Sequence, residues 1–110
     1  MSSFILFHGV EYENDFNNGK YSGFDAYIDF IVWNNAVTFI HAAGNSDQDE
    51  YVNHPGLGLN VITVGSIDGN KCISYSSSYD VNSSCANSLM KPTVVAPGEN
   101  IVLPEMFAYI

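Results

Sequence analysis

The segment VTFIHAAGN, Val37 to Asn45, decides how the fold of this sequence is interpreted. It begins with β-branched and aromatic residues, which favour a strand, and it ends with a glycine followed by an asparagine. We therefore predict a strand at residues 37–43 that is central in a sheet. Asn35 and Ala36 turn the chain just before it.

A helix is predicted immediately before this strand, from Gly23 to Asn34. Ser22 occupies the N-cap position, and Asp25 lies in the first turn, where the helix dipole favours a negative charge. Apolar residues recur at intervals of three and four, the spacing that lines one face of a helix. They are Phe24, Tyr27, Ile28, Ile31 and Val32.

Three further strands are predicted from short apolar runs, at residues 3–7, 60–66 and 93–97. Residues 11–21 are rich in Asn, Asp and Gly, so we expect a solvated loop there. The Asp-Gly-Asn sequence at residues 68–70 predicts a turn. A strand, a helix and a strand in succession are typical of a parallel βαβ unit. The sequence therefore predicts a single domain of the α/β class with a parallel sheet.

The composition indicates a folded domain with an acidic surface. Of the 110 residues 46% are hydrophobic and 14% aromatic, while three lysines stand against twelve Asp and Glu, giving a formal charge of -9. Such a surface repels nucleic acids and anionic membranes. No apolar run approaches the roughly 18 residues that a membrane-spanning helix needs. We expect no nucleic-acid or membrane partner, and calcium is a ligand better suited to this charge.

Two cysteines, Cys72 and Cys85, are too few for a disulfide framework. They form either one bridge that closes a short loop or two separate thiols. The sequence does not place their Cα atoms within bridging distance, so both alternatives stay open.

Gly44 and Asn45 follow the strand that we expect at the centre of the sheet. Ligands of open α/β sheets bind beyond the carboxyl ends of the strands. The glycine permits a tight bend, and the Asn45 amide carries two N–H donors for a developing negative charge. The same two residues are also common in simple turns. Both interpretations remain open on these residues alone.

Four segments in order resemble the second half of the catalytic domain of subtilisin-like serine proteases. They are FIHAAGN, NHPGLGLNVITVGSID, ISYSSSYD and KPTVVAPGENIVLP, and together they extend from Val37 to Pro104. The resemblance implies a fragment of the parallel-sheet, three-layer α/β fold of that family. Residues 1–110 would then form a single partial domain, from the centre of the catalytic domain to a point before the nucleophilic serine.

The resemblance also implies roles for particular residues. Asn45 matches the side-chain donor of the oxyanion hole, which binds the charged oxygen of the tetrahedral intermediate. Ala42, Ala43 and Gly44 match one wall of the pocket for the substrate side chain that precedes the scissile bond. The implied substrate is a polypeptide.

A weaker match precedes this segment, and a further match lies within it at Pro55. Ser2 and Ser3 resemble the strand that pairs with the substrate, which would require residues 11–21 to be an insertion. Pro55 matches a proline whose preceding peptide bond is cis in well-studied relatives, so we expect a cis bond between His54 and Pro55.

The motifs of the family's catalytic triad have no match in this sequence. Its serine motif, Gly-Thr-Ser-Met-Ala, should follow APGENIVLP, and the Asp and His motifs belong upstream of Met1. His8 and Gly9 only echo the family's His-Gly-Thr and lie too close to Asn45. We therefore expect peptide-bond hydrolysis through an acyl-enzyme in the parent enzyme and inactivity of this chain by itself. The resemblance implies an extracellular or cell-surface parent.

The alternative function is that of a short, non-catalytic module, derived from a peptidase, that binds or self-associates. The exposed edges of a truncated sheet would favour a homo-oligomer. An apolar tail would contribute to that contact through Met106, Phe107, Tyr109 and Ile110.

Other polar residues suggest weaker hypotheses. His8, His41 and His54 lack a metal-ligand spacing, and we expect His41 to be a packed core histidine. Calcium could bind the acidic residues that follow Asn45, but they lack the EF-hand spacing, and a solvated loop is the preferred interpretation. These residues are Asp47, Asp49 and Glu50.

Overall fold

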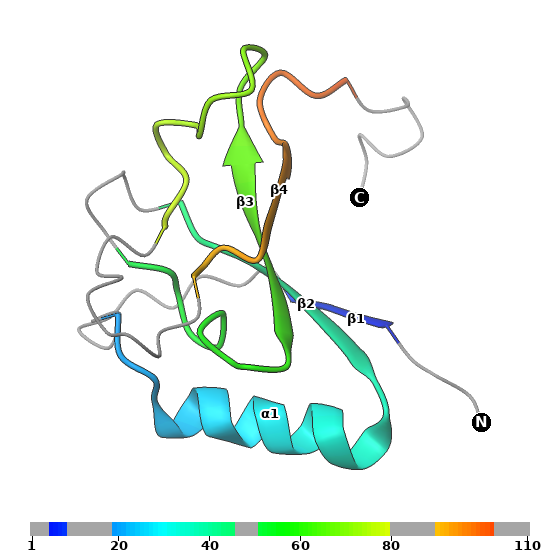
Figure 1. Cartoon of the computed structure of the whole chain (residues 1–110). Coiled ribbons are helices and arrows are strands. Elements are labelled where there is room, and N and C mark those ends of the chain that lie inside the picture. The colour runs from blue at the N-terminus through cyan, green and yellow to red at the C-terminus, as the bar shows by residue number, and fades with distance from the viewer. Residues whose placement is uncertain (1–4, 9–18, 46–50, 80–89, 103–110) are drawn as a thin grey trace.

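Four strands form one parallel sheet in the computed structural model of the chain, with one helix beside it (Figure 1). The structure describes residues 5–8, 19–45, 51–79 and 90–102. In chain order the elements are β1 (Ile5–His8), α1 (Gly23–Asn35), β2 (Thr38–Ala42), β3 (Val61–Ile67) and β4 (Val94–Pro97). The spatial order of the strands is the same as their order in the sequence. The predicted α/β class with a parallel sheet is confirmed.

Strand β2 lies inside the sheet, as its composition predicted. It pairs with β1 on one side, where Phe39 is opposite Leu6, and with β3 on the other, where Phe39 is opposite Val61. Strand β4 pairs with β3 through Val64 opposite Val94. The carboxyl ends of β2, β3 and β4 therefore meet at one edge of the sheet.

Helix α1 begins with a reciprocal capping box between Ser22 and Asp25. The backbone N–H of Ser22 donates to Asp25 Oδ2 at 2.7 Å, and the backbone N–H of Asp25 donates to Ser22 Oγ at 3.4 Å. These two bonds satisfy donors that the first turn of a helix cannot pair internally. The helix ends at Ala36, which has a left-handed conformation with φ of 50°.

The core lies between α1 and one face of the sheet. Ile28 of the helix packs with Phe39 and Val61, and Ile31 and Val32 flank this cluster. A second cluster consists of Ala43, the residue directly after β2, with Val52 and Leu57. Burying apolar side chains in this way supplies about 25 cal/mol per Å² of area removed from water.

The predicted apolar face of the helix was partly wrong. Phe24 is 38% exposed and Tyr27 is 60% exposed, whereas Asp25 and Asp29 are buried. The carboxylates take the inward positions because they accept hydrogen bonds from the loop before β3, as at Asn60. An aromatic side chain would leave these loop donors without a partner.

The turn predicted at residues 68–70 is confirmed. The backbone N–H of Asp68 donates to the carbonyl of Cys72 at 2.8 Å, and Ile67 forms an antiparallel bridge with Ile73. Cys72 is exposed, and Cys85 lies outside the described residues. Within the described segments, no helix is both long and apolar enough to cross a membrane.

Candidate functional site

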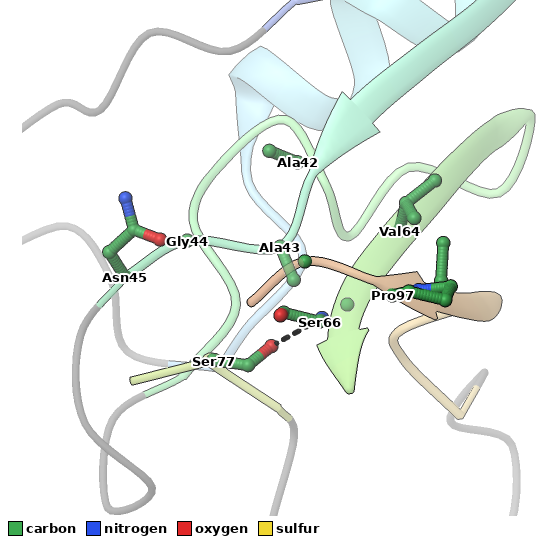
Figure 2. A pocket seen from close by; sticks show the side chains of 11 residues that line it. Ala42, Ala43, Gly44, Asn45, Val64, Ser66, Ser77 and Pro97 are labelled. Atoms are coloured by element: carbon green, nitrogen blue, oxygen red, sulfur yellow. Dashed lines mark hydrogen bonds between the residues drawn. The ribbon is translucent and has the colours of Figure 1, made fainter. Parts of the chain in front are cut away.

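A cavity of about 180 Å³ opens at the carboxyl ends of β2, β3 and β4 (Figure 2). Strand β2 contributes its last residue and the three residues that follow, and β4 contributes its last two residues and the glycine that follows. Strand β3 contributes residues 64–66, and Ser77 comes from the segment after it. The lining residues are Ala42, Ala43, Gly44, Asn45, Val64, Gly65, Ser66, Ser77, Ala96, Pro97 and Gly98. Residues 42–45, four of the residues predicted for a site, thus lie at this cavity.

Three backbone hydrogen bonds hold the chain where it leaves β2. The N–H of Ala43 donates to the carbonyl of Val64 at 2.9 Å, and the N–H of Asn53 donates to the carbonyl of Ala43 at 2.9 Å. The N–H of Ser78 donates to the carbonyl of Gly44 at 3.0 Å. The path of the chain into Asn45 is therefore fixed by contacts from three separate segments.

Gly44 occupies a position that a larger residue would not fit. Its φ of +121° lies in the region that favours glycine. A Cβ at this residue would lie 2.6 Å from Asn53 Nδ2 and 2.9 Å from Ser78 Oγ. The glycine thus permits both the bend after β2 and the close approach of Asn53 and Ser78.

Asn45 lies beyond Gly44 at the rim of the cavity and is exposed (Figure 2). Ala43, in contrast, is only 1% exposed and packs below the strand end. The Asn45 amide carries two N–H donors on an exposed side chain beside the cavity, at the end of a backbone that is held on both sides.

Serine hydroxyls on the other side of the cavity are engaged with one another and with the backbone. Ser66 N–H donates to Ser77 Oγ at 2.9 Å, shown dashed in Figure 2, and Ser66 Oγ lies 2.8 Å from Ser74 Oγ. These serines were not predicted as site residues; Ser66 belongs to β3, and Ser74 and Ser77 come from the serine-rich segment after it. Their hydrogen bonds fix the wall formed by β3 and the segment at Ser77.

A buried acid–imidazole pair lies behind this strand end. Nδ1 of His54 lies 2.7 Å from Oδ2 of Asp25, and the side chains are 7% and 0% exposed. Burial raises the pKa of Asp25, but hydrogen bonds from His54 and Ser22 outweigh burial and hold this pKa below its ordinary value. The peptide bond between His54 and Pro55 is cis, as the resemblance implied.

A second buried acid, Asp29, holds the start of β3. Oδ2 accepts the N–H of Leu59 at 2.9 Å, and Oδ1 accepts the N–H of Asn60 at 2.7 Å. The hydroxyl of Tyr21 donates to Oδ2 at 2.6 Å. This bond to the carboxylate, together with burial, raises the pKa of Tyr21 to about 12.

A buried lysine joins β3 to the segment that enters β4. Nζ of Lys91 donates to the carbonyl of Val61 at 2.7 Å and approaches the hydroxyls of Thr63 and Thr93 at 3.3 and 3.2 Å. Burial lowers the pKa of Lys91, and the charges of Asp29 and Asp25 oppose that effect.

Several predicted site residues lie outside the described part of the chain. Ser2, Ser3 and the acidic residues at 46–50 are among them, so their expected roles stay predictions. His41 is 1% exposed, as expected for a core histidine. In the described segments, no group of three or more His, Cys, Asp and Glu side chains is arranged to hold a metal ion.

The sequence model of the Subtilase family matches residues 11–109. The chain belongs to the subtilase family. Among solved structures, that of the prenylagaramide maturation protease PagA is similar, with a TM-score of 0.64 and 19% sequence identity. The similarity covers 88% of this subtilase chain and 32% of the PagA chain, and at this identity it shows the shared fold. Comparison with curated proteins finds no significant match.

Proposed function

We propose that this chain is part of a subtilisin-like serine endopeptidase and that Asn45 is a donor of its oxyanion hole. The observation that carries the proposal is the position of Asn45: an exposed amide at the rim of a cavity, at the carboxyl end of a central strand. Membership of the subtilase family supports the same assignment. The chain spans 32% of the length of PagA, so the activity belongs to a larger catalytic unit.

The proposed chemistry is peptide-bond hydrolysis through an acyl-enzyme. When a serine attacks the scissile carbonyl, its oxygen becomes negatively charged, and a fixed N–H donor stabilises that charge more than it stabilises the ground state. Bonds to Ala43 and Gly44 hold the backbone before Asn45, so the donor is already placed when the charge develops.

The proposed substrate is a polypeptide. Ala42, Ala43 and Gly44 line the cavity with small or absent side chains, which leaves space for a substrate side chain next to the Asn45 amide. PagA is described as a maturation protease, and a peptide substrate for this chain's parent is in keeping with that description. By family resemblance we also propose an extracellular or cell-surface parent, with calcium as an optional ligand.

The test is made on the complete reading frame that encodes this sequence. Wild type, Asn45→Ala and Asn34→Ala are assayed with a chromogenic peptide. Loss of an oxyanion donor in a subtilisin lowers turnover by about 10²–10³-fold, and we expect kcat of Asn45→Ala to fall in that range with KM little changed. Asn34, an exposed asparagine near the end of α1, is the matched control. Equal kcat for all three proteins would overturn the assignment of Asn45.

The chain by itself is expected to be inactive, because the triad motifs were not found in its sequence. Incubation with a fluorophosphonate probe should label no serine stoichiometrically. Labelling of one serine, followed by loss of label when that serine is replaced, would show that a nucleophile is present after all.

A second candidate function, a self-associating module, is favoured by the outer face of α1. Four aromatic side chains are exposed there: Phe24, Tyr27, Phe30 and Trp33. Both acids of the helix, Asp25 and Asp29, are buried, so this face carries no charge. Two copies with a charge of -9 each repel one another least where such faces meet. We therefore propose a second copy of this chain as the partner of this face.

A further inference from the structure

The contact between His54 and Asp25 ties helix α1 to the loop before β3. Oδ2 of Asp25 is 2.7 Å from His54 Nδ1 and also accepts the backbone N–H and the hydroxyl of Ser22, at 2.7 and 2.8 Å. The carboxylate is fully buried. A buried carboxylate is costly unless it is paired, and a protonated imidazole at this distance neutralises it.

The residue before His54 connects this pair to the candidate site. Asn53 is 3% exposed, and its backbone N–H donates to the carbonyl of Ala43 at 2.9 Å. Its side chain lies against Gly44, since a Cβ there would be 2.6 Å from Asn53 Nδ2. A displacement of His54 is therefore transmitted through one peptide unit to the backbone that carries Asn45.

We propose that His54 is a positioning residue for Asn45: paired with Asp25, it holds Asn53 against Ala43 and Gly44 and so sets the direction of the Asn45 amide. The inference rests on the proposed role of Asn45. Loss of the proton from His54 leaves a buried negative charge without its counter-charge, which weakens the pair and loosens the strand end. The alignment of Asn45 is thus coupled to the protonation of one histidine.

Other titratable groups surround the pair in the described segments. Lys91, before β4, interacts electrostatically with Asp25 and Asp29. A Cβ at Gly56, in the same loop as His54, would lie 3.1 Å from Cδ2 of His41. The nearby groups to be distinguished from His54 are Asp29 on α1, Tyr21 before it, His41 on β2 and Lys91.

The experiment is an NMR titration of the isotopically labelled chain between about pH 5 and pH 8, the range in which histidine titrates. The ring signals of each histidine are followed together with the side-chain amide of Asn45 and the backbone amides of Gly44 and Asn53. We expect the Asn45 and Gly44 signals to move with the midpoint of His54 and not with that of His41. In Asp25→Asn, the midpoints of His54 and Asn45 should shift together to lower pH, because the carboxylate that favours the imidazolium is gone.

Asp29→Asn is the matched control, since it removes a buried carboxylate one turn further along α1 that holds a different part of the loop. It should leave the shared midpoint of His54 and Asn45 in place. Signals of Asn45 that follow another group, or that do not titrate, overturn the inference. If Asp25→Asn fails to fold, the wild-type titration decides alone. The titration does not depend on catalysis, so the two proposals are tested separately. The titration can contradict this inference while the kcat of Asn45→Ala supports the proposed function. The titration can also support the inference while kcat contradicts the proposed function.

Discussion

Lys91 donates a hydrogen bond of 2.7 Å to the backbone carbonyl of Val61, thirty residues earlier in the chain. The lysine is 6% exposed and Val61 is 3% exposed, so the bond is made away from water. It joins the first residue of β3 to the segment that leads into β4 and thus to one side of the candidate site.

Replacing Lys91 with Met should destabilise the fold. The substitution keeps much of the side-chain volume but leaves the carbonyl of Val61 without its strongest donor, which costs about 1–3 kcal/mol. Urea denaturation measures the loss. Lys20→Met, at an exposed lysine, is the control and should stay within about 0.5 kcal/mol of wild type. Equal stability of the two variants would mean that the buried bond contributes nothing.

Acid should destabilise the protein through Asp25. Hydrogen bonds hold the pKa of this carboxyl below its ordinary value in the folded state. Its stabilising contribution is therefore complete above the unfolded pKa of about 4 and is lost as the pH falls through the lower folded-state pKa. We expect the free energy of unfolding, measured at a series of pH values, to fall below about pH 4 more steeply in wild type than in Asp25→Asn. Parallel curves for the two proteins would contradict this prediction.

Most elements of the fold could be predicted from the sequence because local patterns determine them. Ser22 was identified as the N-cap, and the end of α1 was placed within one residue of Asn35. Within the described residues, the ends of the predicted strands differ from those of β1 to β4 by at most one residue, and the predicted start at Ser3 lies outside the described residues. Runs of β-branched residues predict the strands, and turn residues between these runs predict where each strand ends.

The inward direction of Asp25 and Asp29 could not be predicted in the same way. Helical periodicity assigns apolar residues to the core, and it therefore predicted that Phe24 and Tyr27 are buried. Their exposure follows from a partner 29 residues further along the chain, since Asp25 meets His54 only in the folded structure. The burial of Lys91 likewise depends on Val61, which no local pattern connects to it.

The candidate site shows the same division. Gly44 and Asn45 were selected because a glycine and an asparagine follow a strand, and the family resemblance then favoured a site over a turn. Ser66 and Ser77 were not predicted to line the cavity, because hydroxyl side chains are common and do not by themselves indicate a site.

Gly44→Ala should weaken the fold and disturb the site. A φ of +121° and contacts to Asn53 and Ser78 below 3 Å leave no space for a methyl group. Backbone strain of this kind costs about 1–3 kcal/mol. Gly23→Ala is the matched control, because a Cβ at that helical residue meets nothing within 4 Å. Thermal unfolding should rank Gly44→Ala well below Gly23→Ala, and equal melting temperatures would show that the chain after β2 adapts freely.

Trp33, the only tryptophan of the chain, reports on the proposed self-association of α1. It is 82% exposed, so a contact between two outer helix faces would bury it. We expect the molar mass by light scattering to fall on dilution, and the tryptophan emission to move to longer wavelength as Trp33 returns to water. Replacement by Gln should weaken association by roughly 30-fold, or about 2 kcal/mol, the loss typical of an aromatic residue at the centre of an interface.

Tyr75→Gln is the control for Trp33→Gln, because Tyr75 is an aromatic residue that is 70% exposed outside the helix. It should associate like wild type if the outer face of α1 is the interface. If both variants associate equally more weakly than wild type, the outer face of α1 is not the specific interface. A wild-type protein that stays monomeric at high concentration would remove the self-associating module as a candidate function.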